Sequence, residues 1–494
     1  MIRHLSRGWR HCLSSRIRHI LEPIQICMAQ RQRLSPASIQ ILQRDSVVET
    51  EIGELKPIPS RRRGHYTLRS ILVATTVFAI TFAWGTWERD RRHKEGQVAA
   101  WVEREGGTVQ YQDDWISNWI GRTVVGVSLA DTPISDITPL KTLKNLQVLS
   151  LSNTRVCDLS PVSRLRGLRT LLAVNTHVLE LTPISTLNAL EDVRISGSRV
   201  IDLSPITECS NLHNLEFDRT GISDLSPLRD LTTLGSLSLN ETMVSDLVPL
   251  AHMHRLQSLS LGSTAVCNLS PISALHELRH LSFGNTRVSD LTPLTNLSEL
   301  RSIRMTATPV AGLTPLANLP KLHDLFIDNT KITSLSPLAG LREMKELRLT
   351  DTHVADLSPL AKLSRLETLW GARTRVSSVQ PLRGLESLRW IDLDGTSVVD
   401  LEPLADLRKL HFLSLAGTKV TDVASLRTLR NLEILNVQGT SVRNVSPLYV
   451  LRNLRVLNVR KTQTTSSQVQ TLRQELPNCT IHADAFAHDN AALN

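Results

Sequence analysis

From about residue 124 to residue 462, apolar and polar positions alternate in a pattern that repeats every 22 residues. The clearest marker is a proline that returns at this interval from Pro139 to Pro447. The units follow one another without insertion or deletion, and only Ser425 replaces the proline. A period of this length predicts a solenoid, in which each unit buries its apolar face against the neighbouring units.

Two short stretches of each unit predict its elements. An L-x-L pair such as Leu149 and Leu151 alternates like a short strand with one buried face. The D-L-S/T-P stretch that follows predicts the start of a short helical or 3-10 turn. There Ser or Thr would cap free N–H groups, and proline would occupy the first helical position. Each unit is therefore expected to contain a strand, a turn, a short helical return and a second turn.

The unit PISALHELRHLSFGNTRVSDLT resembles the leucine-rich repeat in its 22-residue bacterial, internalin-like form, and the resemblance covers about residues 124–482. It implies an α/β solenoid, a curved stack with a parallel concave sheet and a short helical or 3-10 convex side. Internalin-like repeats carry an Asn ladder after the strand. Here Thr fills that slot from Thr154 to Thr462, with Ser198 as the exception. We expect the threonine hydroxyls to bond to the backbone of the adjacent turn.

The composition indicates which side chains form the core. Aromatic residues make up only 4% of the chain and apolar residues 41%, so the core must consist mainly of Leu, Val and Ile. The cysteines form no C-x-x-C pair, which gives zinc-ribbon and redox sites no support. We expect them to be small buried apolar side chains. They are Cys12, Cys27, Cys157, Cys209, Cys267 and Cys479.

The net charge of +9 is concentrated at the N-terminus. Residues 1–69 hold 13 Lys and Arg against 5 Asp and Glu, so the remainder of the chain is nearly neutral. Residues 1–66 are predicted to be a basic, largely disordered cytoplasmic tail. Two alternatives stay open at its start: residues 3–21 form a basic amphipathic helix on the inner leaflet, or Met28 is the true first residue, in which case residues 1–27 do not belong to the protein.

Residues 70–87 form an uncharged apolar segment, which predicts a transmembrane helix over 68–88. Trp84 and Trp87 lie at one end, where interfacial anchors are common. The basic residues are slightly more numerous before the segment than after it. They favour a single-pass signal anchor with the repeats on the extracytoplasmic side of the cell membrane. The layout resembles the membrane-anchored leucine-rich-repeat proteins of planctomycetes.

The segments beside the repeats are expected to close the two ends of the solenoid. Residues 89–123 would form a juxtamembrane segment and N-terminal cap, with a short helix over 95–105 and a first strand in TVVGVSLADT. Repeats would occupy 124–462. Residues 463–494 would form a C-terminal cap and tail, with a helix that ends at Pro477 and a strand around Thr480–Ile481.

No catalytic site is expected. The Asp and Ser of D-L-S-P recur in most units as turn residues, and no G-x-S-x-G, P-loop, H-E-x-x-H or dinucleotide motif is present. The sequence therefore predicts no enzyme activity, cofactor, metal or small-molecule substrate.

The concave face is the expected binding surface, formed by the positions that alternate with the buried L-x-L residues. Acids outnumber bases there, which disfavours nucleic acid as a partner. The acids are Asp192, Glu216, Asp218, Asp324, Asp328, Glu346, Asp392 and Asp394. The bases are Arg194, Arg304, Arg348 and Arg460.

Aromatic and apolar residues gather on this face in the C-terminal half, as they do in protein-binding hot spots. The predicted ligand-binding residues are Phe326, Arg348, Trp370, Trp390, Asp392, Phe412, Ile434 and Val456. The alternative is that these side chains fall on this face by chance or pack against the C-terminal cap. Gly371 replaces a core leucine, so Trp370 either turns inward to fill the space or projects from the concave face.

The sequence thus predicts a non-catalytic, membrane-anchored repeat protein that binds a protein, an envelope component or a surface ligand. The alternative is a cytoplasmic regulatory scaffold, because repeats of this length also resemble regulatory subunits of phosphatases.

Overall fold

The computed structural model describes residues 68–112 and 122–484, without the side chains of 68–71. The chain divides into two compact units, Met1–Thr76 and Val77–Asn494. Of the first unit only residues 68–76 are described, and they are helical. The predicted tail over 1–66, with Cys12 and Cys27, lies outside the described residues. The second unit contains the repeats.

One sheet of eighteen strands runs through the second unit. The pair β1–β2 is antiparallel, and all other neighbours from β2 to β18 pair in parallel in chain order. The strands are β1 Thr108–Gln112, β2 Thr123–Ser128, β3 Val148–Ser150, β4 Thr170–Leu172, β5 Asp192–Arg194, β6 Asn214–Glu216, β7 Ser236–Ser238, β8 Ser258–Ser260, β9 His280–Ser282, β10 Ser302–Arg304, β11 Asp324–Phe326, β12 Glu346–Arg348, β13 Thr368–Trp370, β14 Trp390–Asp392, β15 Phe412–Ser414, β16 Ile434–Asn436, β17 Val456–Asn458 and β18 Thr480–His482.

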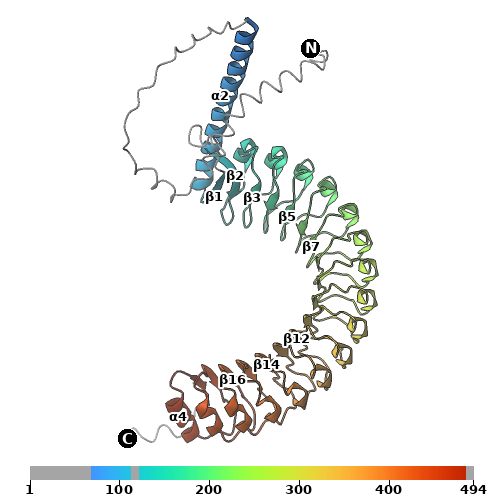
Figure 1. The fold of residues 1–494 in the computed structure, drawn as a ribbon, viewed down its shortest axis with the longest axis vertical. Helices are drawn as coiled ribbons and strands as arrows, with labels where there is room; N and C mark the ends of the chain where they lie inside the picture. The colour runs from blue at the N-terminus through green and yellow to red at the C-terminus, as the bar shows by residue number, and fades with distance from the viewer. Residues whose placement is uncertain (1–67, 113–121, 485–494) are drawn as a thin grey trace, which may run out of the picture. The chain divides into compact units, whose positions relative to one another are not determined.

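A short 3-10 turn follows each strand from β2 to β16 on the convex side, opposite the sheet (Figure 1). Proline at the first or second position presets the backbone angle that the turn needs. The turns are η2 Thr138–Thr142, η3 Ser160–Arg164, η4 Thr182–Ile184, η5 Ser204–Ile206, η6 Ser226–Leu228, η7 Val248–Leu250, η8 Ser270–Ile272, η9 Thr292–Leu294, η10 Thr314–Leu316, η11 Ser336–Leu338, η12 Ser358–Leu360, η13 Gln380–Leu382, η14 Glu402–Leu404, η15 Ala424–Thr428 and η16 Ser446–Val450.

Register is constant along the sheet because paired residues lie 22 positions apart. Leu347 pairs with Leu369, and Leu369 pairs with Ile391. The middle residue of each strand points inward with the leucines of the 3-10 side, and together they form one continuous buried core. The predicted leucine-rich-repeat solenoid, with its parallel sheet and 3-10 side, is confirmed.

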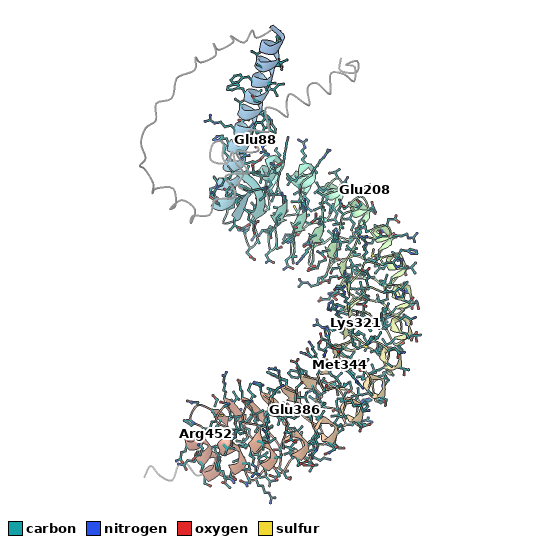
Figure 2. All side chains as sticks on the ribbon, in the orientation of Figure 1. Glu88, Glu208, Lys321, Met344, Glu386 and Arg452 are labelled. Carbon is teal, nitrogen blue, oxygen red and sulfur yellow. The ribbon has the colours of Figure 1, made fainter. Side chains whose placement is uncertain are left out.

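Side chains project from both sides of the ribbon (Figure 2), and ion pairs on the outside of the solenoid link successive turns. Lys321 pairs with Glu299 at 2.6 Å, and Arg452 with Glu475 at 2.8 Å. Exposed pairs of this kind contribute about 0–1 kcal/mol each, so the core rather than the surface holds the stack together.

The acceptor at the start of most 3-10 turns is Asp, which corrects the expected capping by the Ser or Thr before the proline. Asn takes its place in η8 and η16, and Ser in η11 and η13. Asp158 Oδ1 accepts the N–H of Ser160 at 2.7 Å, and its Oδ2 accepts the Ser160 hydroxyl at 2.7 Å. Ser160 is already the first residue of η3, so its hydroxyl donates and does not cap. The equivalent hydrogen bonds from Thr292, first from its hydroxyl and then from its N–H, lower the pKa of Asp290.

The threonine ladder also differs from the expectation. Thr154 donates its hydroxyl to the carbonyl of Leu151 at 2.6 Å, and Thr308 to that of Met305 at 2.7 Å. The acceptor lies three residues earlier in the same turn, not in the adjacent turn. Backbone groups make the bonds between turns, such as Asn153 N–H to Val174 O at 2.7 Å. Each of these threonines therefore stabilises the turn in which it lies.

Ser198 provides a natural comparison for this ladder. Its hydroxyl is buried, and within the described part of the chain it has no hydrogen-bond partner. We expect Thr308→Val to lower the free energy of unfolding by about 1–2 kcal/mol, because the variant loses a buried hydrogen bond without changing shape. Ser198→Ala should change it by less than about 0.5 kcal/mol. Urea unfolding measures both, and equal losses would contradict a stabilising role for the ladder.

The residue before each of these threonines adopts the left-handed conformation, with φ between 52° and 69° from Asp131 to Lys461. Asn, Asp and Gly suit this conformation and occupy most of the positions. Arg219, Glu241 and Ala307 adopt it as well. The loop geometry therefore comes from the repeat, even where the local residue disfavours it.

Two cysteines lie elsewhere than expected. Cys157 and Cys267 are exposed, whereas Cys209 is buried and Cys479 half-buried. All four are free thiols. Burial raises the pKa of Cys209 to about 11, so this thiol stays protonated and inert. The expectation of buried cysteines is therefore wrong for Cys157 and Cys267.

A single helix, α2, runs from Leu68 to Arg104 and continues through the predicted boundary at residue 88. Its last turns place Val98, Ala99 and Val102 in the core beside β2, so this end closes the stack. The antiparallel strand β1 is an addition that the sequence did not predict. Across the described residues, no helix has both the length and the apolar character to cross a membrane.

At the other end, helix α4 spans Ser466–Glu475, and β18 adds the last parallel strand, as predicted. Thr465 and Gln468 form a reciprocal capping box at the start of α4. Val469, Leu472 and Leu476 are buried against the last repeat. These side chains cover the apolar end of the stack.

Candidate functional site

The predicted binding residues come from two neighbouring columns of the concave sheet. Phe326, Arg348, Trp370 and Asp392 follow one another at the last position of β11, β12, β13 and β14. Trp390, Phe412, Ile434 and Val456 follow one another at the first position of β14, β15, β16 and β17. The predicted register is therefore observed for every one of these residues.

Four rings form what we call the aromatic platform: Phe326, Trp370, Trp390 and Phe412. Trp390 and Phe412 stack face to face, with ring centroids 4.3 Å apart and an angle of 10°. Trp370 reaches across from its own column to lie 6.0 Å from Trp390 and 6.1 Å from Phe412. Such pairs stabilise by about 0.5–1.5 kcal/mol beyond the area they bury.

Two arginines extend the platform toward the middle of the sheet. The guanidinium carbons of Arg304 and Arg348 lie 4.8 Å and 4.9 Å from the ring centre of Phe326. Arg348 also lies 5.2 Å from the ring of Trp370. Phe326 is therefore buried beneath two cations. The platform and the two guanidinium groups form one connected row from β10 to β15.

Arg304 is the residue of this row that the predicted set omitted. It lies one repeat before Phe326 in the same column, at the last position of β10. Its sequence signal was a base directly before Phe326 in this column. Its contact with the Phe326 ring, which the sequence does not show, makes it part of the row.

The orientation of Trp370 is resolved by its contacts. Its side chain is partly exposed on the concave face, while the backbone of Gly371 keeps the sheet ladder with a 2.7 Å bond to Asp392 O. A Cβ at position 371 would meet Leu393 Cδ2 at 3.2 Å and Leu349 Cδ1 at 3.5 Å. Leucines of the two adjacent turns therefore fill the space, and Trp370 is free to join the platform.

We expect Gly371→Leu, which restores the residue typical of this core position, to destabilise the protein by about 1–3 kcal/mol. Leu349 and Leu393 already occupy the space, so a new side chain would overpack it. Gly371→Ala should change the free energy of unfolding by less than about 1 kcal/mol. Chemical denaturation measures both variants. A stabilised Gly371→Leu would show that the two leucines can withdraw.

Carboxylates border the platform. Asp328 accepts the N–H of Thr350 at 2.9 Å, and Asp392 accepts that of Asp394 at 3.0 Å. Partial burial raises the pKa of both carboxyl groups. Asp394 accepts the Ser414 hydroxyl at 2.5 Å and the Ala416 N–H at 2.6 Å, which fixes its position beside Asp392.

Neither indole N–H of the platform has a hydrogen-bond partner within the described segments. Nε1 of Trp370 and Nε1 of Trp390 are both buried among their neighbours. An unpaired buried donor costs about 1–3 kcal/mol. The rings are held by stacking and by the contact of Arg348 with Trp370, and both indole N–H groups remain available to an acceptor on a bound molecule.

Ile434 and Val456 continue the column of Trp390 and Phe412 as half-buried aliphatic side chains. They belong to the same apolar stripe, but no ring contact links them to the platform. Val456 pairs with Thr480 of the C-terminal cap strand, so the stripe ends at the cap.

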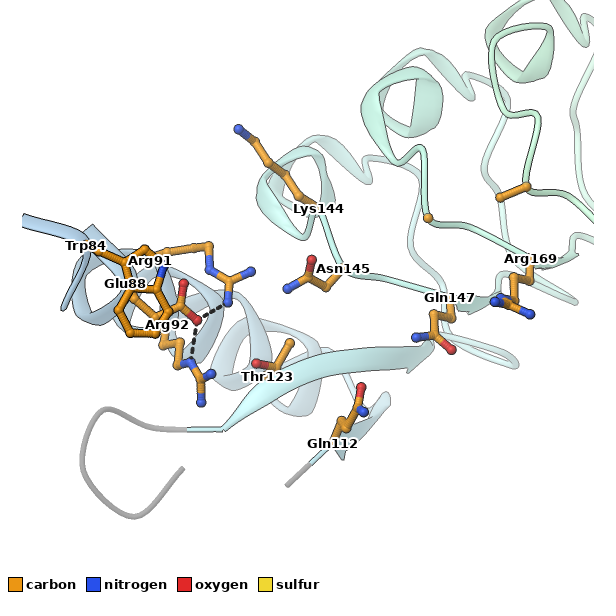
Figure 3. A pocket seen from close by; sticks show the side chains of 12 residues that line it. Trp84, Glu88, Arg91, Arg92, Gln112, Thr123, Lys144, Asn145, Gln147 and Arg169 are labelled. Carbon is orange, nitrogen blue, oxygen red and sulfur yellow. Dashed lines mark hydrogen bonds and ion pairs between the residues drawn. The ribbon is translucent and has the colours of Figure 1, made fainter. Parts of the chain in front are cut away.

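A second hollow lies where α2 meets the first turns (Figure 3). Glu88 accepts hydrogen bonds from both Arg91 and Arg92. Burial alone would raise the pKa of Glu88, but these arginines hold it below its usual range. Desolvation raises the pKa of Glu95, which accepts the Val124 N–H at 3.2 Å. The hollow is lined by Glu88 and by four cations, Arg91, Arg92, Lys144 and Arg169, so its charge is positive where the helix meets the sheet.

The described residues contain no group of three His, Cys, Asp or Glu side chains that could hold a metal ion. The Asp and Ser residues at the starts of the 3-10 turns hydrogen-bond each other on the exposed convex side. The geometry of the concave face therefore suits binding through stacked rings and charges.

Comparison with known proteins identifies the fold. No family model matches the chain, and no curated protein matches it. An internalin (InlF) from Listeria monocytogenes shares 27% identity, with a TM-score of 0.57, over 59% of this chain and 87% of the internalin. A leucine-rich-repeat protein from Leptospira interrogans is 17% identical, with a TM-score of 0.63, over 71% of this chain and 100% of its own.

A plant peptide hormone receptor, RGFR1, was solved in complex with RGF2 and also has this fold. It is 15% identical, with a TM-score of 0.55, over 70% of this chain and 68% of the receptor. These neighbours are internalin-like bacterial repeat proteins and a receptor ectodomain, which agrees with the resemblance of the 22-residue unit.

Proposed function

We propose that this internalin-like leucine-rich-repeat chain is a non-catalytic binding protein that holds a protein ligand against its aromatic platform. The observation that supports this proposal most is the connected row of Arg304, Phe326, Arg348, Trp370, Trp390 and Phe412. Tryptophan and arginine are the residues most enriched at binding hot spots. A rigid stack loses little conformational entropy when a ligand docks.

The chemistry of the face favours protein over other ligands. The concave acids outnumber the bases, which disfavours a polyanion such as nucleic acid. An open sheet face offers no enclosed pocket for a small-molecule substrate. The plant neighbour was solved with a peptide hormone, which is consistent with a polypeptide ligand on this fold.

The test is capture of a binding partner by the chain and by Trp390→Ala/Phe412→Ala. The double variant removes the stacked pair, so we expect it to lose at least nine-tenths of the specifically captured protein. The matched control is Ile201→Ala/Val399→Ala, which removes two apolar side chains that are 67% and 51% exposed. Circular dichroism confirms that both variants are folded. Unchanged capture by the platform variant would refute the proposal.

We further propose that residues 70–87 attach the chain to a cell membrane, with the repeats on the extracytoplasmic side. None of the described helices is at once long enough and apolar enough for a span. Support comes from its exposed apolar side chains, including Phe78, Ile80 and Phe82, and from Trp84 and Trp87 beyond them. Digestion of the repeats by protease added to intact cells is expected. Resistance to digestion, with recovery in the soluble fraction, would favour the cytoplasmic scaffold.

A further inference from the structure

The surroundings of the aromatic platform carry an unbalanced negative charge. At the concave positions of the turns that hold β10 to β15 there are five carboxylates and two guanidinium groups, a net charge of −3 with His neutral. The carboxylates are Asp324, Asp328, Glu346, Asp392 and Asp394, and the cations are Arg304 and Arg348. A ligand that docks here meets an apolar centre with an acidic border.

The two cations are already engaged. Arg304 and Arg348 lie over the rings of Phe326 and Trp370, and Arg348 Nε also donates to Glu346 at 2.8 Å. Asp324 Oδ2 lies 3.0 Å from Nδ1 of His323, and this imidazole is charged only when it is protonated. For Asp328, Asp392 and Asp394, no ion pair is found within the described ranges. These three carboxylates accept bonds from N–H groups and from the hydroxyls of Thr350 and Ser414. Arg348 lies near enough to Asp328, and Arg373 to Asp392, to act on their pKa values without an ion pair.

We infer that the occupant of the aromatic platform is a basic polypeptide segment. It would place one Arg or Lys at Asp328 and another at the Asp392–Asp394 pair, with an apolar side chain between them on Trp370. This inference rests on the proposed function and specifies the partner of that site. A cation at each position would compensate carboxylates that the docked ligand desolvates further.

The spacing of the carboxylates sets the spacing of the basic residues. Asp328 and Asp394 occupy equivalent positions three turns apart. Neighbouring strands lie about 4.8 Å apart, which puts the two carboxylates about 14 Å apart along the sheet. An extended peptide advances about 3.3 Å per residue, so the distance corresponds to four residues. Side chains at i, i+2 and i+4 share one face, which gives a basic–x–apolar–x–basic motif.

Fluorescence anisotropy with three labelled peptides tests the inference on the full chain in detergent. The probes are GRSWSRG, its acidic counterpart GESWSEG, and GRSSSRG, which lacks the apolar residue. We expect GRSWSRG to bind at least tenfold more tightly than either of the others, and its affinity to fall as NaCl concentration rises. Equal binding of the three peptides, or tighter binding of GESWSEG, would overturn the inference.

Charge variants test which carboxylates of the concave face bind the basic residues of the peptide. Asp328→Asn/Asp392→Asn keeps the acceptor oxygens but removes two charges, so it should weaken GRSWSRG at least tenfold. Asp422→Asn, whose carboxylate accepts the Ala424 N–H on the convex side, is the matched control and should leave binding unchanged. Equal effects of the two, or displacement of the peptide by a neutral oligosaccharide such as maltohexaose, would refute a basic occupant.

Different results would contradict the proposed binding function and the proposed basic ligand. If partner capture depends on Trp390 and Phe412 but no charge variant changes peptide binding, only the basic character of the ligand is wrong. If Trp390→Ala/Phe412→Ala leaves partner capture unchanged, the proposed function itself is wrong.

Discussion

Deletion of the C-terminal cap, with the chain ended after Thr462, is expected to destabilise the end of the solenoid by about 5 kcal/mol or more. Helix α4 buries Val469, Leu472 and Leu476 against the last repeat. Each buried aliphatic side chain of this size stabilises by about 1.5–3 kcal/mol. The deletion also removes β18, which leaves the edge of β17 unpaired.

The expected signature is local. A solenoid's stability is roughly a sum of repeat and neighbour terms, so the last turns should unfold before the rest. We expect an early transition in thermal circular dichroism, stronger binding of the dye ANS, and aggregation at higher concentration. A single transition at the temperature of the full chain would contradict this prediction.

A matched pair of point variants separates packing from chain length. Leu472→Asp places a charge at a fully buried position of α4, and it should reproduce most of the effect of the deletion. Gln474→Asp introduces the same charge at an exposed position of the same helix and should leave the transition unchanged. Equal effects of the two variants would indicate that charge, and not burial, matters at this cap.

The repeat made most of the fold predictable from the sequence. Because the period is constant, a strand assigned around Leu149 predicts an equivalent strand around Leu369 and in every other unit. The register of the sheet therefore followed from one unit. The concave columns were predictable for the same reason, because residues 22 apart must lie side by side. The contacts between columns were not predictable. Trp370 meets Trp390 diagonally, which depends on side-chain reach.

Local hydrogen bonding was harder to predict than register. A threonine hydroxyl can donate to its own turn or to the next one, and the residue pattern is the same in both cases. In D-L-S-P, both Asp and Ser are good caps, and only the geometry shows that Asp accepts from Ser160. The left-handed position was visible where Asn or Gly occupies it, but not at Arg219 or Ala307.

The second large effect is expected at Phe283. This ring is fully buried at the inner position after β9, equivalent to Leu151 and Gly371 in other turns. We expect Phe283→Ala to lower the free energy of unfolding by about 3–5 kcal/mol, because it removes buried apolar area and leaves a cavity. Phe283→Leu places the usual residue at this position, so it should lower the free energy of unfolding by much less. Urea denaturation followed by circular dichroism measures both.

Gly371 occupies the equivalent inner position of a later turn, so the surroundings of the two residues can be compared. Around Gly371 the leucines of the turns on either side approach the empty position, so a missing side chain there leaves little space. Around Phe283 the neighbours at the same position, Leu261 and Met305, are themselves fully buried, and they pack beside a full ring. They would have to move inward for the core to close. A loss below about 1 kcal/mol would show that they do, and that the solenoid adjusts its core turn by turn. A loss near 4 kcal/mol would mean that the packing at Gly371 is specific to that turn and is part of what presents Trp370 on the binding face.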